Sequence, residues 1–175
     1  MSSWNRFLIL AILALMVGCA SFGPIGTSEF EPALRRDIPS VEGSLLYHAP
    51  ASLLYGVNGY DLMDNVAIRA ANTSGRDTIS GQGIVIIFDK HLYFVRWIQG
   101  KYVADWDTDL KRVISVEFRT LGRGRRVVLQ LNLDESPVHV SFSASTDNGQ
   151  FIDQERTEAV CQVIATQSGL ECKHS

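Results

Sequence analysis

Apolar and polar residues alternate along much of the second half of the chain, which is the period of β-strands that bury one face. Every second position is Ile, Val, Leu or Phe in three segments, residues 114–119, 127–133 and 138–143. The residues between these apolar positions, such as Ser141 and Ser143, are expected to face water. The pattern predicts three antiparallel strands.

Residues 83–97 have a different pattern, in which two continuous apolar runs are separated by Asp89 and Lys90. Runs of this length, rich in β-branched and aromatic residues, predict two strands of a hairpin joined by a tight turn. Residues 102–104 predict a further short strand after a turn at Gly100.

The chain before this hairpin predicts shorter strands. Residues 45–47 and 52–55 are apolar segments on either side of Pro50, which we expect to interrupt or end a strand because proline cannot donate a ladder hydrogen bond. Residues 66–71 predict another strand, and residues 72–82 predict a long polar connection.

The hydrophobic period changes to that of an α-helix near the C-terminus. Residues 154–168 place four residues on one helical stripe, namely Thr157, Val160, Cys161 and Ile164. Asp153 suits the start of this helix and Gly169 suits its end. Because a single apolar stripe needs a surface to cover, the sequence predicts a mainly β fold, a small antiparallel barrel or sandwich of about seven strands with one C-terminal helix.

At the N-terminus, one positive charge at Arg6 precedes an uninterrupted apolar run, residues 7–17. This run has the length of a secretory signal core and is too short to span a membrane as a helix. It ends in Met16-Val17-Gly18-Cys19, which resembles the lipobox of bacterial lipoprotein signal peptides, although Met16 stands where Leu is usual. Two alternatives are an ordinary secretory signal and an uncleaved anchor helix with an incidental cysteine.

The lipobox resemblance implies that residues 1–18 are removed and that Cys19 carries diacylglycerol and a further acyl chain such as palmitate. Several acyl chains anchor a protein durably where one would not. Ala20 and Ser21 carry no acidic retention signal, so the resemblance implies the outer membrane, facing the periplasm, or the cell membrane if the organism has only one.

Residues 20–40 contain glycines and prolines without a sustained period, and we expect residues 19–40 to form a flexible tether to a domain at residues 41–175. The tether has three apolar exceptions that could pack on the domain, Phe22, Phe30 and Leu34.

Two cysteines remain once Cys19 is assigned to the anchor. In an oxidising compartment, Cys161 and Cys172 predict one disulfide, and the alternative is two free thiols.

The formal net charge is −3 at pH 7, which argues against nucleic acid as the main partner and against electrostatic docking on anionic lipid. Four arginines nevertheless surround a glycine turn, Arg119, Arg123, Arg125 and Arg126. Their guanidinium groups could hold phosphate or carboxylate groups of a ligand or partner through forked hydrogen bonds. The alternative is a solvated hairpin tip whose charges protect a sheet edge from aggregation.

The sequence contains no recognisable catalytic, metal or cofactor motif. Residues 105–109 resemble the start of a calcium loop, but Leu110 and Val116 occupy the places that need glycine and glutamate. The histidines lack metal-ligand spacing, and no Gly-x-Ser-x-Gly elbow is present.

About seven strands followed by one helix resemble the pleckstrin-homology-like (PH-like) superfold, and more narrowly its GRAM-type variant. The segments that carry the resemblance are residues 83–97, 110–118 and 153–167. A lipocalin-like barrel is the main rival fold. We expect a non-catalytic envelope protein that binds another envelope protein. The alternatives are a β-barrel carrier of a small apolar ligand and a hydrolase with a dispersed site.

Overall fold

The computed structural model describes residues 22–56, 78–121, 124–133 and 136–175. In this part of the chain, eight strands form one sheet in the order β4-β3-β2-β1-β7-β6-β5-β8. The strands are β1 (Leu45–Gly56), β2 (Thr78–Phe88), β3 (His91–Ile98), β4 (Lys101–Asp109), β5 (Val113–Leu121), β6 (Gly124–Leu133), β7 (Ser136–Ala144) and β8 (Cys172–His174). The other elements are helix α2 (Phe30–Asp37), the 3-10 turn η1 (Leu110–Arg112) and helix α4 (Gln154–Ser168).

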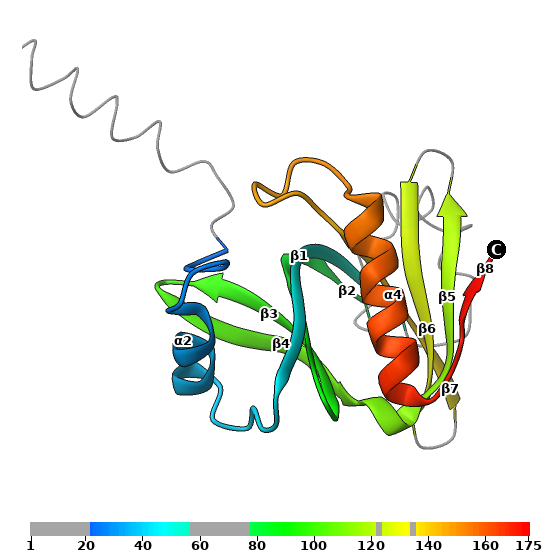
Figure 1. The fold of residues 1–175 in the computed structure, drawn as a ribbon, viewed down its shortest axis with the longest axis horizontal. Coiled ribbons are helices and arrows are strands. Elements are labelled where there is room, and N and C mark those ends of the chain that lie inside the picture. Colours follow the sequence, from blue (N-terminus) through cyan, green and yellow to red (C-terminus); the bar gives the residue numbers. More distant parts are fainter. Residues whose placement is uncertain (1–21, 57–77, 122–123, 134–135) are drawn as a thin grey trace, which may run out of the picture.

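The sheet folds into two layers, one containing β2, β3 and β4 and the other containing β5, β6 and β7 (Figure 1). Strand β1 joins the layers, since it pairs with β2 on one side and with β7 on the other. The main core lies between the layers and α4, and its side chains include Val85, Phe94, Leu129, Phe142 and Ile164, all at most 1% exposed. Each such side chain contributes roughly 1.5–3 kcal/mol when it leaves water. The predicted mainly β sandwich with one C-terminal helix is confirmed, and the sheet is not closed into a barrel.

The predicted hairpin and the predicted C-terminal helix are both confirmed. Strand β2 ends at Phe88 and β3 begins at His91. At the start of α4, Asp153 Oδ1 accepts the backbone N–H of Arg156 at 3.0 Å. The helix ends at Gly169, whose φ of 68° is the left-handed conformation that glycine adopts without strain.

Strand β1 is continuous, so the predicted interruption at Pro50 is wrong. Pro50 pairs with Ile84 of β2, and its carbonyl accepts the N–H of Ser145 at 2.8 Å. The ladder between β1 and β7 begins only at Ala51. Because the N–H and C=O of a strand residue point to the same side, the missing donor of Pro50 faces Ser145 just beyond the end of β7, and proline forgoes a single bond there.

A β-bulge changes which residues of β5 are buried. The alternation predicts Ile114 on the core face with Val116 and Phe118, but Ile114 is 48% exposed and Val113 is buried in its place. The register between β5 and β6 shifts between Val113 and Ser115, so Ile114 is the extra residue of the bulge.

Two strands extend beyond their predicted limits. Strand β2 begins at Thr78, so the polar connection predicted over residues 72–82 is wrong for its last part, and β4 continues past residues 102–104 to Asp109. The strand predicted over residues 66–71 lies outside the described residues.

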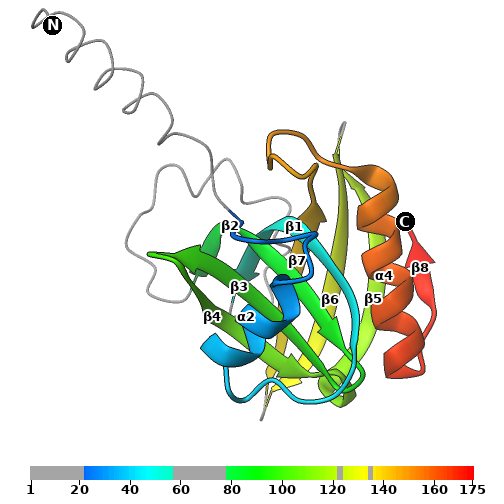
Figure 2. The same cartoon turned by 60° about the vertical axis from the view of Figure 1, so that its left-hand side comes forward.

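The N-terminal segment, residues 22–43, packs on the outer face of β2, β3 and β4, where a flexible tether was predicted over residues 19–40 (Figure 2). The expectation that Phe22, Phe30 and Leu34 pack on the domain is confirmed, since all three are buried. They form a second apolar cluster with six residues of the sheet, Ile84, Ile86, Phe88, Tyr93, Val95 and Tyr102. For residues 22–40 the tether prediction is wrong, because β2 is apolar on both faces and therefore needs a cover on each side.

The C-terminus adds a strand that no pattern predicted. Strand β8 pairs parallel to β5, with Cys172 opposite Val116. The predicted disulfide between Cys161 and Cys172 is formed, with 5.8 Å between the two Cα atoms, and it joins β8 to α4. Of the helices in the described ranges, none has the length and apolar character needed to cross a membrane.

Candidate binding groove

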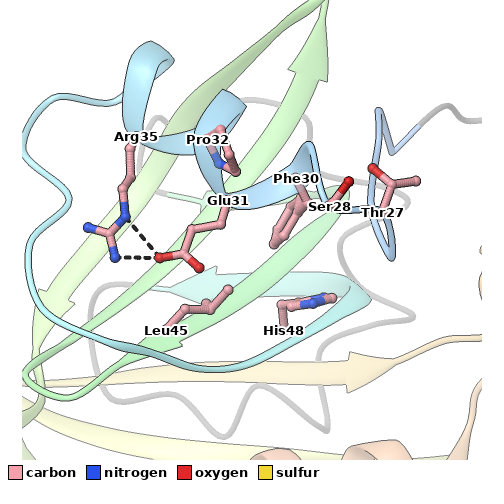
Figure 3. A pocket seen from close by; sticks show the side chains of 8 residues that line it. All are labelled: Thr27, Ser28, Phe30, Glu31, Pro32, Arg35, Leu45 and His48. Atoms are coloured by element: carbon pink, nitrogen blue, oxygen red, sulfur yellow. Dashed lines mark hydrogen bonds and ion pairs between the residues drawn. The ribbon is translucent and has the colours of Figure 1, made fainter.

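A surface groove lies where the N-terminal segment meets β1. It consists of two adjoining hollows of about 500 and 570 Å³ that share His48 as a wall. The first hollow, shown in Figure 3, is lined by Thr27, Ser28, Phe30, Glu31, Pro32, Arg35, Leu45 and His48. The second is lined by Ile25, Gly26, His48, Pro50, Asp147 and Arg156. We call both together the His48 groove.

His48 stands on the outer face of β1, where it pairs with Ile86 of β2. The Phe30 ring lies against its imidazole, with ring centroids 4.5 Å apart. Its Nδ1 is buried and has no hydrogen-bond partner among the described residues. Burial lowers the pKa of His48, and the positive charge of Arg156 lowers it further. The imidazole is therefore neutral at pH 7.

The two cations of the groove are paired. Arg35 donates to Glu31 Oε1 at 2.6 Å and to the Gly43 carbonyl at 2.7 Å. Arg156 pairs with Asp147, and its Nε lies 3.3 Å from Asp153 Oδ2. The hydrogen bond from Arg156 holds the pKa of Asp147 below its usual range, so that carboxylate keeps its charge. Each guanidinium thus faces a carboxylate, and the groove offers no unbalanced positive charge to a phosphate group.

Strand β1 has an open backbone edge beside the groove. The ladder with β7 stops at Ala51, and one more bond joins Ser145 to the Pro50 carbonyl. His48 is two residues before Pro50, so its backbone N–H and C=O point to that same side. Within the described part of the chain, no strand pairs with β1 there before Ala51. An unpaired edge of this kind can accept the backbone of another chain.

The groove has a mixed apolar and polar lining. None of the hydrogen bonds found among the described residues joins His48 to a hydroxyl or a carboxylate. The Thr27 hydroxyl already donates to the Pro24 carbonyl at 2.7 Å and accepts the Glu29 N–H at 3.2 Å. Phe30, Leu45 and Pro50 instead supply apolar surface. The groove is therefore suited to holding a mixed apolar and polar segment of a partner.

The structure divides the predicted arginine cluster between two faces of the sheet. Arg119 and Arg126 are directly opposite each other on β5 and β6, so their side chains share one face. Arg125 lies on the other face, with its guanidinium carbon 5.9 Å from the centre of the Phe118 ring. Arg123 lies outside the described residues. Anion or partner binding by these arginines stays a prediction.

The expectation that Ser141 and Ser143 of β7 face water is wrong. Ser141 and Ser143 are at most 1% exposed. Arg126 Nη1 lies 3.4 Å from Ser141 Oγ, and the Ser143 hydroxyl donates to the Arg125 carbonyl at 3.0 Å. Arg126 is itself partly buried, and this burial lowers the pKa of its guanidinium group.

The sequence also raised the lipobox, metal binding and a calcium loop at residues 105–109. The lipobox, Met16 to Cys19, lies outside the described residues. The described residues contain no group of three or more His, Cys, Asp or Glu side chains able to hold a metal ion. Residues 105–109 belong to β4 rather than to a calcium loop, with Trp106 and Thr108 buried.

Sequence reasoning missed His48, because a single histidine in an apolar segment carries no motif. The signal that could have found it is Pro50. Proline inside a strand is confined to positions where the N–H side has no ladder partner, so Pro50 indicates an unpaired edge nearby.

No protein-family model matches the sequence, and the comparison with curated proteins found no match. Among solved structures, the hSac2 domain from human phosphoinositide phosphatase Sac2 is similar at 8% identity and a TM-score of 0.50, over 83% of this chain and 85% of that chain. At this identity the likeness concerns the fold alone.

Two further similar structures contain DH/PH domains. The DH/PH domains of p115-RhoGEF (R399E mutant) match at 10% identity and a TM-score of 0.45, over 82% of this chain. The DH/PH fragment of PDZRHOGEF in complex with human RhoA matches at 11% identity and 0.44, over 72% of this chain. The matches cover 36% and 29% of those longer chains.

Proposed function

We propose that this protein is a lipid-anchored, non-catalytic binding module of the bacterial envelope, which holds an extended segment of another envelope protein against β1. The observation that carries the proposal is the open edge of β1 beside the His48 groove. A PH-like fold supports it only as a scaffold, because fold does not determine function.

The anchor in this proposal comes from the sequence. Met16 to Cys19 resemble a lipobox, and Ala20 and Ser21 carry no acidic retention signal. The acylated protein would stand on the periplasmic face of the outer membrane, or on the cell membrane of an organism with one membrane. The disulfide between Cys161 and Cys172 is consistent with export to an oxidising compartment.

A bound segment would lie as an added strand along residues 46–49 of β1. The backbone N–H and C=O of His48 would form the ladder bonds, and alternate side chains of the segment would enter the two hollows. Because both cations of the groove are ion-paired, a segment of low net charge with apolar side chains is the favoured partner.

The alternative of a carrier for a small apolar ligand has less support. A carrier needs an empty interior, whereas the space between the layers is occupied by large side chains such as Phe94, Trp106 and Phe142. The sheet is also open rather than closed around a lumen.

Photo-crosslinking in the native envelope tests the binding proposal. A photoreactive amino acid is placed at Leu46, which is 41% exposed beside the open edge, or at Ile114, which is 48% exposed on β5. Both positions are bulge residues, so they form a matched pair. We expect a specific envelope protein, identified by mass spectrometry, at position 46 alone and only when Cys19 is intact. Equal products at both positions, or a lipid alone, would overturn the proposal.

A pair of substitutions adds an affinity measurement. Leu46→Lys places a charge where a strand must add, and lysine is a common protection of sheet edges. Neither variant carries the photoreactive residue. We expect the affinity for the partner identified by crosslinking to fall at least tenfold with Leu46→Lys and to stay unchanged with Ile114→Lys, at equal thermal stability.

A further inference from the structure

The loop before α4 exposes apolar side chains on an ordered frame. Phe151 is 67% exposed and Ile152 is 47% exposed. The loop is held by hydrogen bonds from the Thr146 N–H to the Phe151 carbonyl at 2.9 Å and from the Gly149 N–H to the Thr146 carbonyl at 2.7 Å. Adjacent apolar side chains exposed on a fixed turn are typical of a surface that meets another protein or a membrane.

The first described residues lie directly beside this loop. Phe22 is buried, and a Cβ placed on Gly149 would lie 2.8 Å from its ring. The Tyr102 hydroxyl donates to the Phe22 carbonyl at 3.1 Å, which fixes the backbone there. Figures 1 and 2 both show the N-terminal segment and the loop before α4 close together at the same end of the molecule.

The chain between the predicted lipid and this fixed point is very short. Only Ala20 and Ser21 separate Cys19 from Phe22. Three Cα-to-Cα steps of about 3.8 Å limit the distance from Cys19 to Phe22 to about 11 Å. An acylated Cys19 lies at the membrane surface, so Phe22 would be held within about 11 Å of that surface, with the adjoining loop beside it.

We propose that Phe151 and Ile152 insert into the interfacial layer of the membrane that holds the acylated Cys19, so that the domain lies on the membrane in one fixed orientation. This inference rests on the lipid anchor of the proposed function. The contact is apolar rather than electrostatic, because the charged residue at this turn, Asp147, is paired with Arg156. The anchor supplies the affinity, and the loop determines which face of the domain meets the lipid.

Tryptophan quenching by brominated lipid tests the orientation. The acylated protein is reconstituted into phosphatidylethanolamine/phosphatidylcholine vesicles with or without bromine on the acyl chains. Phe151→Trp reports on the loop, and Leu170→Trp, at a 36% exposed leucine, is the control. These residues flank α4, whose 15 residues span about 22 Å. Trp97 and Trp106 are present in every variant, and their signal is subtracted with the wild-type protein.

We expect brominated lipid to reduce the added emission of Phe151→Trp by about half, with a shift to shorter wavelength, and to leave that of Leu170→Trp unchanged. The mass of the N-terminal peptide is measured first. A mature protein without acyl groups on Cys19 would overturn the anchor, and this inference with it. An acylated protein in which both tryptophans are quenched equally, or neither is, would overturn the orientation and leave the anchor and the β1 proposal standing.

Discussion

Replacing Leu34 by alanine measures how much the N-terminal segment contributes to the fold. Leu34 lies on α2 with 0% of its surface exposed, between the helix and the outer face of the sheet. Removing a fully buried leucine side chain typically lowers the free energy of unfolding by about 3 kcal/mol, part of it from the cavity that remains. Leu46→Ala removes the same atoms from a 41% exposed position and should lower it by at most about 1 kcal/mol.

Urea unfolding of the mature chain without its lipid, followed by far-UV circular dichroism, gives both values. A chain of this size has a denaturant slope of about 2 kcal/mol per molar urea, so we expect the midpoint to fall by about 1.5 M with Leu34→Ala. The slope itself should stay unchanged if unfolding remains two-state.

Equal midpoints for Leu34→Ala and Leu46→Ala would refute this reasoning. Such a result would mean that the segment detaches before the sheet unfolds, so that its contacts contribute nothing to global stability. It would also remove the short connection between Cys19 and the domain on which the membrane orientation depends.

Three further changes have expected outcomes. Replacing Cys161 and Cys172 by alanine should lower the free energy of unfolding by about 3 kcal/mol, the chain-entropy value for a separation of 11 residues, and urea unfolding of reduced wild-type protein should agree. Because burial lowers the pKa of His48 in the folded state, the unfolded chain takes up the proton first; stability should be full above about pH 6.5 and fall below it. Urea midpoints at pH 7.5 and 5.5 should therefore differ more for wild type than for His48→Gln. Tyr102→Phe removes the bond to the Phe22 carbonyl and should cost about 1 kcal/mol in the same assay, whereas no loss would mean that this bond is not made.

Local patterns predicted those elements that carry a regular hydrophobic period or a continuous apolar run. Helix α4 was predicted from its stripe and its caps, because Thr157, Val160 and Cys161 face a single surface. The hairpin at Asp89 and Lys90 was predicted because two β-branched runs flank a short polar pair.

The failures share a physical cause, namely contacts between segments distant in the sequence. Helix α2 has only Phe30, Ala33 and Leu34 to bury, too few for a visible period, and its cover role depends on the outer face of β2. The bulge at Ile114 depends on the register with β6. The His48 groove depends on where β7 leaves β1, which no local pattern encodes.

Strand β8 has a consequence for the solubility of the protein. It covers the edge of β5 with three residues and is held there by a covalent bond to α4. An uncovered β5 edge would be a template for pairing with other chains. Synthesis in a reducing cytoplasm would leave this cover unfastened, so recombinant yield should depend on oxidising conditions during folding. Oxidation and protection from aggregation are in this way coupled through one cysteine in the middle of α4 and three residues of strand.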